Sequence, residues 1–103
     1  YYFIAPTKYD EKTIRKKWND QTPKFLIEFK ERLKMISDFN SENIEVEFKK
    51  YLTEKNLGMG KLLPAFRISL TGLSMGPSLF DIASLIGKEE TINRIEKAIK
   101  ILA

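Results

Sequence analysis

The sequence predicts an all-α protein, a compact bundle of about six helices, and three observations carry this prediction. Apolar residues recur at three- and four-residue spacing in several segments, and residues typical of helix ends separate those segments. No segment shows the sustained alternation of apolar and polar residues that marks a strand. The length of 103 residues suits one domain. We therefore expect residues 1–103 to form a single α-helical unit.

The N-terminal segment, residues 1–7, is expected to be extended. Pro6 disfavours helical conformation in the residue that precedes it. Residues 1–4 are Tyr-Tyr-Phe-Ile, and we expect these apolar side chains to pack against the body of the domain. The alternative is that the aromatic rings stack on nucleic-acid bases.

The next segment is predicted to be a short basic helix that runs from an Asp10 cap to about Trp18. Ile14 and Trp18 are four residues apart and share one face. Its other sides carry basic residues: Lys12, Arg15, Lys16 and Lys17. Such a run is usually a solvated surface, and this is our main interpretation. The alternative is a patch that contacts nucleic-acid phosphates.

A longer amphipathic helix is predicted to follow. Thr22 is expected to be its cap and Pro23 its first helical residue, and the helix should reach Ser37 or Asp38. Its expected buried stripe consists of Phe25, Leu26, Phe29, Leu33 and Ile36.

A third helix is predicted to begin at a Ser41 cap and to end at Asn56 or Gly58, since both residue types favour the left-handed conformation at helix ends. The expected buried residues are Ile44, Phe48, Tyr51 and Leu52.

Residues 61–87 form the most apolar stretch, and we expect the bundle to be organised around it. Proline is tolerated in the first turn of a helix, so Pro64 places the start of the regular helix near Leu62 or Leu63. Gly72 is expected to end this helix in the left-handed conformation.

A second apolar helix is predicted to open at Gly76-Pro77, with Pro77 at its first position, and to end at Gly87. Ser78 and Asp81, three residues apart, are candidate side-chain caps. Together the two helices are expected to form a buried helical hairpin over residues 62–87.

The last predicted helix follows Gly87, where Glu89 and Glu90 favour a helix start. Its expected buried stripe consists of Ile92, Ile95, Ile99 and Leu102.

The composition excludes several kinds of chemistry. The chain has no cysteine and no histidine, which removes disulfides, thiol nucleophiles, imidazole catalysis and nearly all zinc sites. No apolar run reaches the ~18–20 residues that span a bilayer, so we expect no membrane partner. The net charge of +4 gives a mild preference for polyanions. The chain starts at Tyr1 rather than Met, and we expect it to be a piece of a longer protein.

Candidate catalytic groups are weak. Carboxylate pairs such as Glu28 and Glu31 fall on polar helix faces, without the apolar surroundings that raise a carboxyl pKa for acid catalysis. Lys61 follows a glycine, as in some nucleotide sites, but it stands in a helical context with no preceding strand. We therefore expect no catalytic residue, no metal site and no cofactor within this chain.

One dense motif runs through the apolar stretch. It reads P-x-x-R-x-x-L-T-G, then a short turn ending in Gly-Pro, then x-L-F and a helix that closes at L-x-G-K-E. This pattern resembles the C-terminal end of bacterial-type glutamyl-tRNA synthetases, which are class I aminoacyl-tRNA synthetases, and it covers about 40 residues. The matching positions are Pro64, Arg67, Leu70, Thr71, Gly72, Gly76, Pro77, Leu79, Phe80, Leu85, Gly87, Lys88 and Glu89.

The resemblance implies that the chain is the C-terminal anticodon-binding domain of a cytoplasmic, monomeric glutamate–tRNA ligase. A preceding helical module and a catalytic domain using ATP and Mg²⁺ would belong to the same parent chain, and this fragment alone would be non-catalytic. The implied partner is the anticodon loop of the glutamate tRNA. Specific RNA contacts favour such unstacked loop bases. The implied contact residues are Arg67, Gly76, Pro77, Leu79 and Phe80.

Two details limit what the resemblance implies. Some family members have Thr where this chain has Gly76, so only a backbone contact is expected there. A further arginine, which reads the third anticodon base in some relatives, belongs to the preceding module and is expected upstream of Tyr1. The resemblance therefore leaves open whether the parent charges only the glutamate tRNA or also the glutamine tRNA.

The same residues also have structural interpretations. Leu79 and Phe80 are core residues by default, although successive positions cannot both face one core. Arg67 could pair with Asp81 and so hold two helices together. For the whole chain, the alternative function is a helical protein-interaction module with incidental positive charge.

Overall fold

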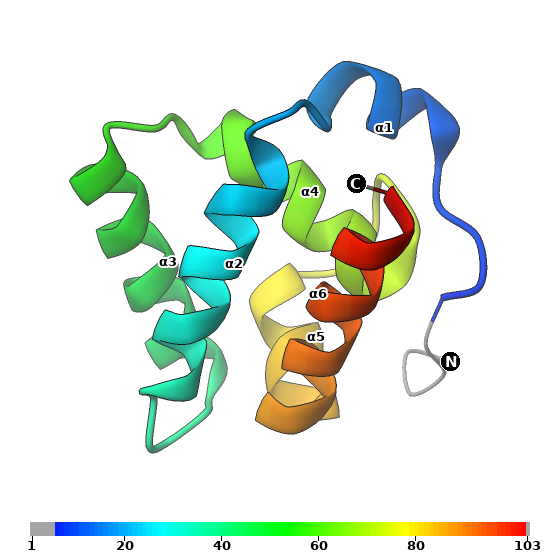
Figure 1. Cartoon of the computed structure of the whole chain (residues 1–103). Coiled ribbons are helices and arrows are strands. Elements are labelled where there is room, and N and C mark those ends of the chain that lie inside the picture. The colour runs from blue at the N-terminus through cyan, green and yellow to red at the C-terminus, as the bar shows by residue number, and fades with distance from the viewer. Residues whose placement is uncertain (1–5, 103) are drawn as a thin grey trace.

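The structure is a computed structural model that describes residues 6–102, and in this range it contains six helices and no strand (Figure 1). The helices are α1 (Glu11–Lys17), α2 (Thr22–Lys34), α3 (Ser41–Lys55), α4 (Met59–Thr71), α5 (Leu79–Ile86) and α6 (Lys88–Leu102). The predicted all-α class and the number of helices are confirmed.

Several helix ends use the expected residues. The Asp10 carboxylate accepts a hydrogen bond of 3.0 Å from the Thr13 N–H and so caps α1. Asn56 and Gly72 end α3 and α4 in the left-handed conformation, with φ of 56° and 75°. Gly87 follows α5, as expected. A side-chain cap thus marks the start of α1, and left-handed residues mark the ends of α3 and α4, where the sequence indicated.

Two predicted caps were wrong by one residue. Asn40, rather than Ser41, caps α3, because its side chain accepts a hydrogen bond of 2.8 Å from the Asn43 N–H. Thr22 is already helical, and its hydroxyl accepts a hydrogen bond from the Asn19 N–H outside α2. Helix α2 also ends at Lys34, short of the predicted Ser37 or Asp38.

The two apolar helices also begin elsewhere than predicted. Helix α4 starts at Met59, which places Pro64 inside the helix and beyond its first turn. A proline there leaves the Gly60 carbonyl without its usual intrahelical N–H partner. Helix α5 starts at Leu79, so Pro77 lies outside it, and Ser78 is the N-cap without a side-chain capping bond.

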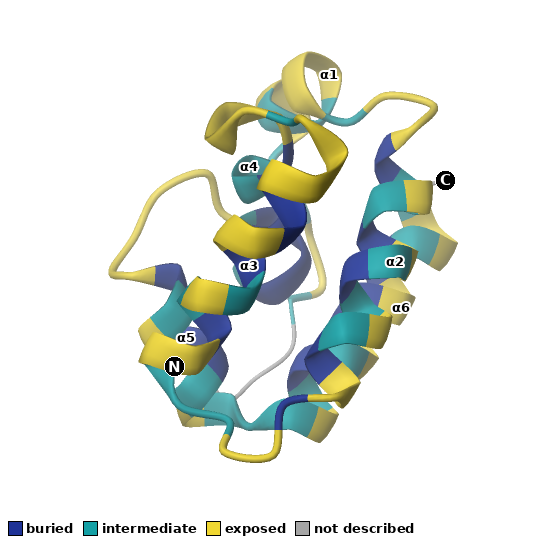
Figure 2. Ribbon diagram, turned by 90° about the vertical axis from the view of Figure 1, so that its left-hand side faces the viewer, coloured by how far each residue is buried: buried dark blue, intermediate teal, exposed yellow. Residues whose placement is uncertain are grey.

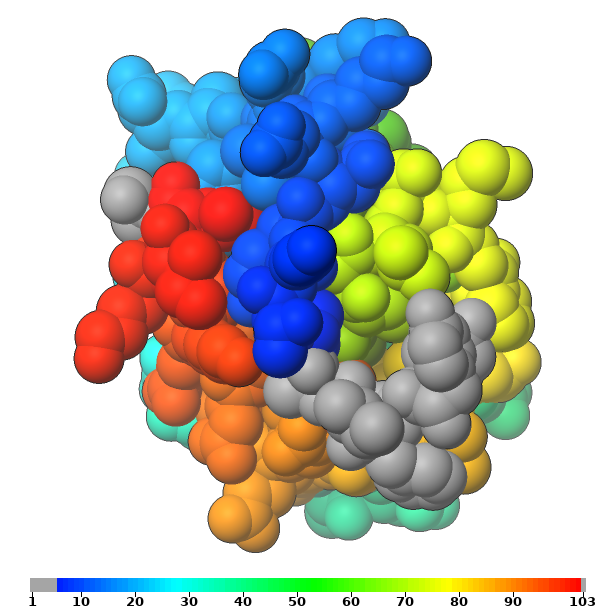
Figure 3. Space-filling view, turned by 90° about the vertical axis from the view of Figure 1, so that its right-hand side faces the viewer, coloured from blue at the N-terminus to red at the C-terminus, as the bar shows by residue number. Residues whose placement is uncertain are grey.

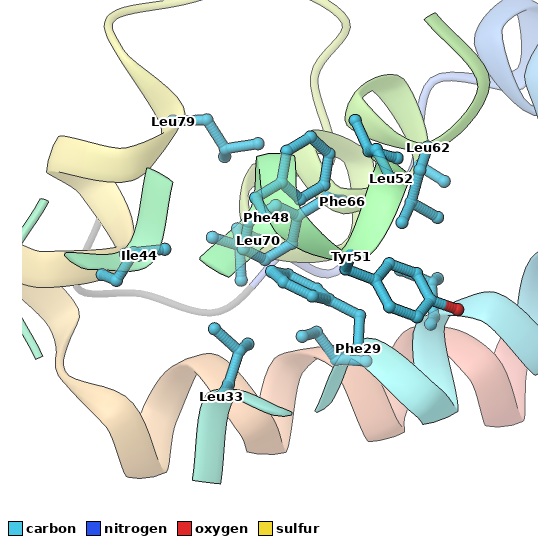
Figure 4. Close-up of a cluster of buried hydrophobic side chains, with 14 of the residues drawn as sticks. Phe29, Leu33, Ile44, Phe48, Tyr51, Leu52, Leu62, Phe66, Leu70 and Leu79 are labelled. Atoms are coloured by element: carbon cyan, nitrogen blue, oxygen red, sulfur yellow. The ribbon is translucent and has the colours of Figure 1, made fainter. Parts of the chain in front are cut away.

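Aromatic side chains from four helices form the centre of the core. The Phe29 ring of α2 lies edge-on to Phe48 of α3 and Phe66 of α4, with centroid distances of 5.1 and 5.2 Å. Figure 4 shows these rings converging with the ring of Tyr51. Edge-to-face pairs at such distances add to the free energy of burial. The ring of the partly buried Phe80 of α5 lies with its centroid 5.6 Å from the centroid of the Phe48 ring.

Helices α4 and α5 supply the apolar stretch that was predicted as a buried hairpin, and both contribute to one core cluster. Helix α4 packs against α1, α2 and α6, whereas α5 packs against α3 and α6. The prediction that α4 is largely buried is confirmed by Leu62, Phe66, Ile68 and Leu70. Residues 62–87 thus supply two helices that share α6 as a neighbour and otherwise lie beside different helices (Figures 1 and 2).

The buried side of α6 includes the predicted isoleucines and extends beyond them, since Ile92 and Ile99 are partly buried against the core. Ile95 is fully buried as expected, but its buried neighbours are Thr91, Arg94 and Ala98. Arg94 is 2% exposed, and its guanidinium donates to the Leu70 carbonyl at 2.8 Å and to the Glu90 carboxylate at 2.7 Å. The charged group is therefore tolerated because it is paired and hydrogen-bonded.

The chain approaches α1 along a groove between α4 and α6. The Asp10 N–H donates to the Gly72 carbonyl at 2.9 Å, and the Lys97 ammonium donates to the Pro6 carbonyl at 3.3 Å. In Figure 3 this blue segment lies between the red end of α6 and the yellow-green end of α4. The predicted packing of residues 1–4 lies outside the described residues.

Candidate nucleic-acid interface

The connection between α4 and α5, residues 73–78, is an exposed turn, which we call the recognition turn. Every residue in it is exposed, and Figure 2 shows it as the loop that leads into α5. Two residues explain why this segment is not helical. Gly72 ends α4 in the left-handed conformation, and Pro77 has no N–H with which to continue a hydrogen-bonded helix. The turn therefore presents its backbone and side chains to solvent.

Helix α4 holds the recognition turn at both ends. At the first end, the Thr71 hydroxyl accepts a hydrogen bond of 3.1 Å from the Leu73 N–H and donates to the Arg67 carbonyl at 3.0 Å. At the other end, the Arg67 guanidinium donates to the Pro77 carbonyl at 2.9 Å. Two side chains one helical turn apart thus fix the shape of an otherwise exposed loop.

Arg67 does not make the pairing with Asp81 that its position allowed. Within residues 6–102, its guanidinium forms one hydrogen bond, to Pro77, and no ion pair. Asp81 is exposed, in the first turn of α5. A guanidinium carries five N–H donors and two flat faces, so most of this capacity is left for another partner.

The other predicted contact residues lie in two different environments. Gly76 and Pro77 belong to the exposed recognition turn. Leu79 is 2% exposed and its side chain belongs to the core, while Phe80 is partly buried beside Phe48. The structure therefore brings Arg67, Gly76 and Pro77 together at the surface and leaves the Leu79 side chain no access to a ligand.

Three further residues of this region were not among the contact residues that the resemblance implied. Thr71 holds the first end of the turn, and its signal was the short polar side chain next to the glycine that ends α4. Leu73 and Met75 are 41% and 79% exposed, so their apolar side chains are accessible to a ligand. Their signal was an apolar residue on each side of Ser74 within a glycine- and proline-containing turn.

This arrangement can recognise a flat, partly polar ligand. The turn offers backbone groups and exposed apolar side chains, and the adjacent guanidinium offers hydrogen bonds and a stacking face. Unstacked RNA bases are read by this combination. Within residues 6–102 no helix is long and apolar enough to cross a membrane.

Comparisons with known proteins identify the family. Residues 1–99 match the family of anticodon binding domains. This match spans nearly the whole chain, and the chain belongs to that family.

The individual relatives that carry a similar domain are glutamate–tRNA ligases. The glutamate–tRNA ligase of Flavobacterium psychrophilum is 53% identical over 102 residues, which are 99% of this chain and 20% of that protein. The glutamate–tRNA ligase of Flavobacterium johnsoniae is 49% identical with the same coverage. The chain therefore spans about a fifth of the length of the curated relatives it matches.

A solved structure agrees in fold as well as in sequence. The glutamate tRNA ligase of Elizabethkingia meningosepticum superposes with a TM-score of 0.94 at 40% identity, covering 99% of this chain and 20% of that one. The resemblance to glutamyl-tRNA synthetases is confirmed, and the alternative of a helical protein-interaction module is not favoured.

Proposed function

We propose that this chain is the part of a glutamate–tRNA ligase that binds the anticodon loop of the glutamate tRNA. The observation that carries the proposal is the recognition turn, which is exposed but held at both ends by Arg67 and Thr71 of α4. A preformed surface loses little conformational entropy when it binds, which favours selective contacts. The family of anticodon binding domains and the glutamate–tRNA ligase relatives support the choice of ligand.

The recognition turn and Arg67 read unstacked anticodon bases in this proposal. Gly76 and Pro77 contribute backbone and ring surface, and the guanidinium of Arg67 contributes hydrogen bonds while its Nη1 keeps the Pro77 carbonyl. Leu79 acts only through its backbone, since its side chain is buried. Phe80 supports the turn from the core side through its contact with Phe48.

The remaining parts of the ligase reaction belong elsewhere in the proposed parent. Within residues 6–102 no three acidic, histidine or cysteine side chains come together as metal ligands. We derive no step through ATP or Mg²⁺ in this chain. We assign ATP, Mg²⁺ and glutamate to a catalytic domain joined to this one through a preceding helical module, in a monomeric cytoplasmic enzyme.

The test is anticodon discrimination by an Arg67→Ala variant. RNA hairpins with the glutamate anticodon and with a single altered anticodon base are titrated by fluorescence anisotropy. If Arg67 reads a base edge, the variant should lose about 1–3 kcal/mol of discrimination between the two hairpins. Arg15→Ala is the control, because it removes the same charge from the exposed face of α1. It should lower the affinity for both hairpins by about the same factor.

Two results would contradict the proposed role of Arg67. A folded Arg67→Ala variant that discriminates like the wild type would restrict Arg67 to holding the Pro77 carbonyl. Equal binding of both hairpins by the wild-type chain would remove anticodon reading altogether. Arg67→Lys separates the two roles, because lysine can still donate to Pro77 but lacks the planar fork.

A further inference from the structure

A group of lysines from two helices borders two adjoining surface pockets beside the recognition turn. Lys16 and Lys17 of α1 and Lys61 of α4 border a pocket of about 330 Å³, together with Asn19, Gly58 and Gly60. A second pocket of about 260 Å³ is bordered by Lys12, again by Lys16 and Lys17, and by Ser74. We call these two adjoining pockets the lysine groove.

The groove carries four lysines, and none of their ammonium groups is held by an ion pair or a hydrogen bond within residues 6–102. These lysines are Lys12, Lys16, Lys17 and Lys61. Lys12 and Lys16 are four residues apart on one face of α1, where like charges repel each other. A bound anion would relieve this repulsion.

The Asp10 carboxylate, which also borders the groove, is already engaged. It lines the second pocket, but it caps α1 by accepting hydrogen bonds from the Thr13 N–H and hydroxyl. These bonds lower the pKa of Asp10 and keep the carboxylate facing its own helix. Gly58 and Gly60 border the other pocket, and a side chain added at either glycine would meet open space. No neighbouring side chain therefore covers these two glycines beside Lys61.

The groove is continuous with the recognition turn. Ser74 belongs to the turn and borders the same pocket as Lys12, Lys16 and Lys17. Figure 3 shows the blue first helix lying beside the yellow-green end of α4 and the yellow turn. An RNA strand whose bases rest on the turn must carry its phosphates away along a neighbouring surface, and this groove is such a surface.

We infer that the lysine groove binds consecutive phosphates of the RNA strand that leaves the recognition turn, and this inference rests on the proposed function. Lys16, Lys17 and Lys61 contact the backbone at the far pocket, and Lys12 contacts it nearer to Ser74. Phosphate contacts position an RNA and add affinity without reading its sequence. The groove thus contributes salt-dependent affinity for the RNA, and the recognition turn contributes selectivity among anticodons.

The experiment compares two variants that remove the same charge. The groove variant is Lys16→Gln, Lys17→Gln and Lys61→Gln. The control variant is Lys24→Gln, Lys50→Gln and Lys100→Gln, three exposed lysines of α2, α3 and α6 that form no ion pair within residues 6–102. Affinity for the hairpin with the glutamate anticodon is measured at several salt concentrations by fluorescence anisotropy, and circular dichroism checks that both variants fold.

The groove variant should show a weaker salt dependence of binding. For a single strand, each lysine that no longer neutralises a phosphate should reduce the slope of log K against log salt by ~0.7, so three substitutions should reduce it by about 2. The control variant should keep the wild-type slope. The groove variant should also retain the wild-type ratio of affinities for the matching and altered anticodons, since phosphates carry no sequence information.

Four results would overturn the inference. An equal decrease of the slope in both variants would mean that the RNA responds to the overall positive charge of the surface and does not bind in the lysine groove. An unchanged slope in the groove variant, with Arg67→Ala still losing discrimination, would remove the groove and leave the proposed function intact. No RNA binding by the wild-type chain would remove both. Loss of discrimination in the groove variant would make these lysines supports of the turn instead of phosphate ligands.

Discussion

Gly72 shows how one residue determines where the recognition turn begins. Its φ of 75° is unfavourable for any residue with a Cβ, and the surrounding space is also closed. A Cβ built at this position would lie 2.2 Å from the Lys8 carbonyl oxygen and 3.0 Å from the Pro6 Cβ. The N-terminal segment packs directly on this glycine, and Asp10 donates to its carbonyl. Conformation and close packing therefore both require glycine.

Gly72→Ala should destabilise the domain strongly, and Gly87→Ala provides the matched comparison. Gly87 also has a positive φ, of 92°, but a Cβ there would meet nothing within 4 Å. Backbone strain alone costs about 1–3 kcal/mol at Gly87, because its φ of 92° and ψ of 164° fall in a region that is essentially confined to glycine. Urea unfolding should therefore show a loss of about that size for Gly87→Ala and a clearly larger loss for Gly72→Ala. Equal losses would mean that the N-terminal segment moves away at little cost.

At the scale of elements, α2 and α3 are joined through a buried phenol and a half-buried carboxylate. The Tyr51 ring is fully buried, and its hydroxyl donates to the Glu28 carboxylate at 2.7 Å. Lys55 lies 3.1 Å from the same carboxylate. The Tyr51 hydroxyl and then Lys55 hold the pKa of Glu28 below its usual value of 4.5. Burial, and then Glu28, raises the pKa of Tyr51.

Tyr51→Phe should cost less at low pH than at neutral pH. A carboxyl whose pKa is lowered by folding contributes stability above its unfolded pKa, and that contribution is lost as pH falls through the folded pKa. At pH 7 the variant should therefore be less stable by about 0.5–1.5 kcal/mol, the usual worth of one hydrogen bond. Below about pH 4 the difference from wild type should shrink, which urea unfolding at several pH values measures.

Glu28→Gln is the control for the Tyr51 prediction. It removes the titrating carboxylate but keeps an oxygen that can accept the hydrogen bond from Tyr51. The free energy of unfolding should therefore depend less on pH in the acid range, although much of the stability at neutral pH remains. A stability difference between Tyr51→Phe and wild type that stays constant from pH 7 to pH 3 would show that the hydroxyl acts without the carboxylate charge.

At the scale of the whole molecule, the described helices form one compact unit. The Cα radius of gyration is 12.3 Å, close to the ~13 Å expected for a folded domain of this length. Contacts tie every helix into the same body, including the largely exposed α1, which packs against α4. We therefore predict that the chain alone folds as a helical monomer and unfolds in one cooperative transition.

Circular dichroism and size-exclusion chromatography measure this prediction directly. The expected spectrum is dominated by helix, and the expected elution volume is that of a 12.0 kDa monomer. The same sample should show no glutamate- and tRNA-dependent ATP turnover. A dominant sheet signal, a stable oligomer or measurable turnover would each contradict one part of the prediction.

RNA binding by this chain alone should be weak, with a dissociation constant that is micromolar or higher. The net charge of +4 is modest, and the proposed neighbouring module is not there to hold the other side of the loop. Tight binding that does not depend on salt would contradict this expectation and would also count against the lysine groove.

The sequence by itself determined the helical class, most of the core and the position of the turn. Helical periodicity identified Phe29, Phe48 and Tyr51 as buried, because amphipathic spacing is a local property that each helix carries in its own residues. Gly72 was assigned to a left-handed helix end for a similarly local reason. The family motif then pointed to Arg67 and the residues after it.

Only the tertiary structure decided which elements meet and which side chains remain accessible. No periodicity could place α5 beside α3, since that choice depends on packing between distant segments. The same holds for Arg94, whose burial is possible only because the distant Leu70 carbonyl accepts its hydrogen bond. Packing of α1 on α4 likewise decided that Lys16 and Lys17 share a pocket with Lys61, more than 40 residues away in sequence. Contacts between distant residues arise from the folded arrangement as a whole, so local sequence patterns do not carry them.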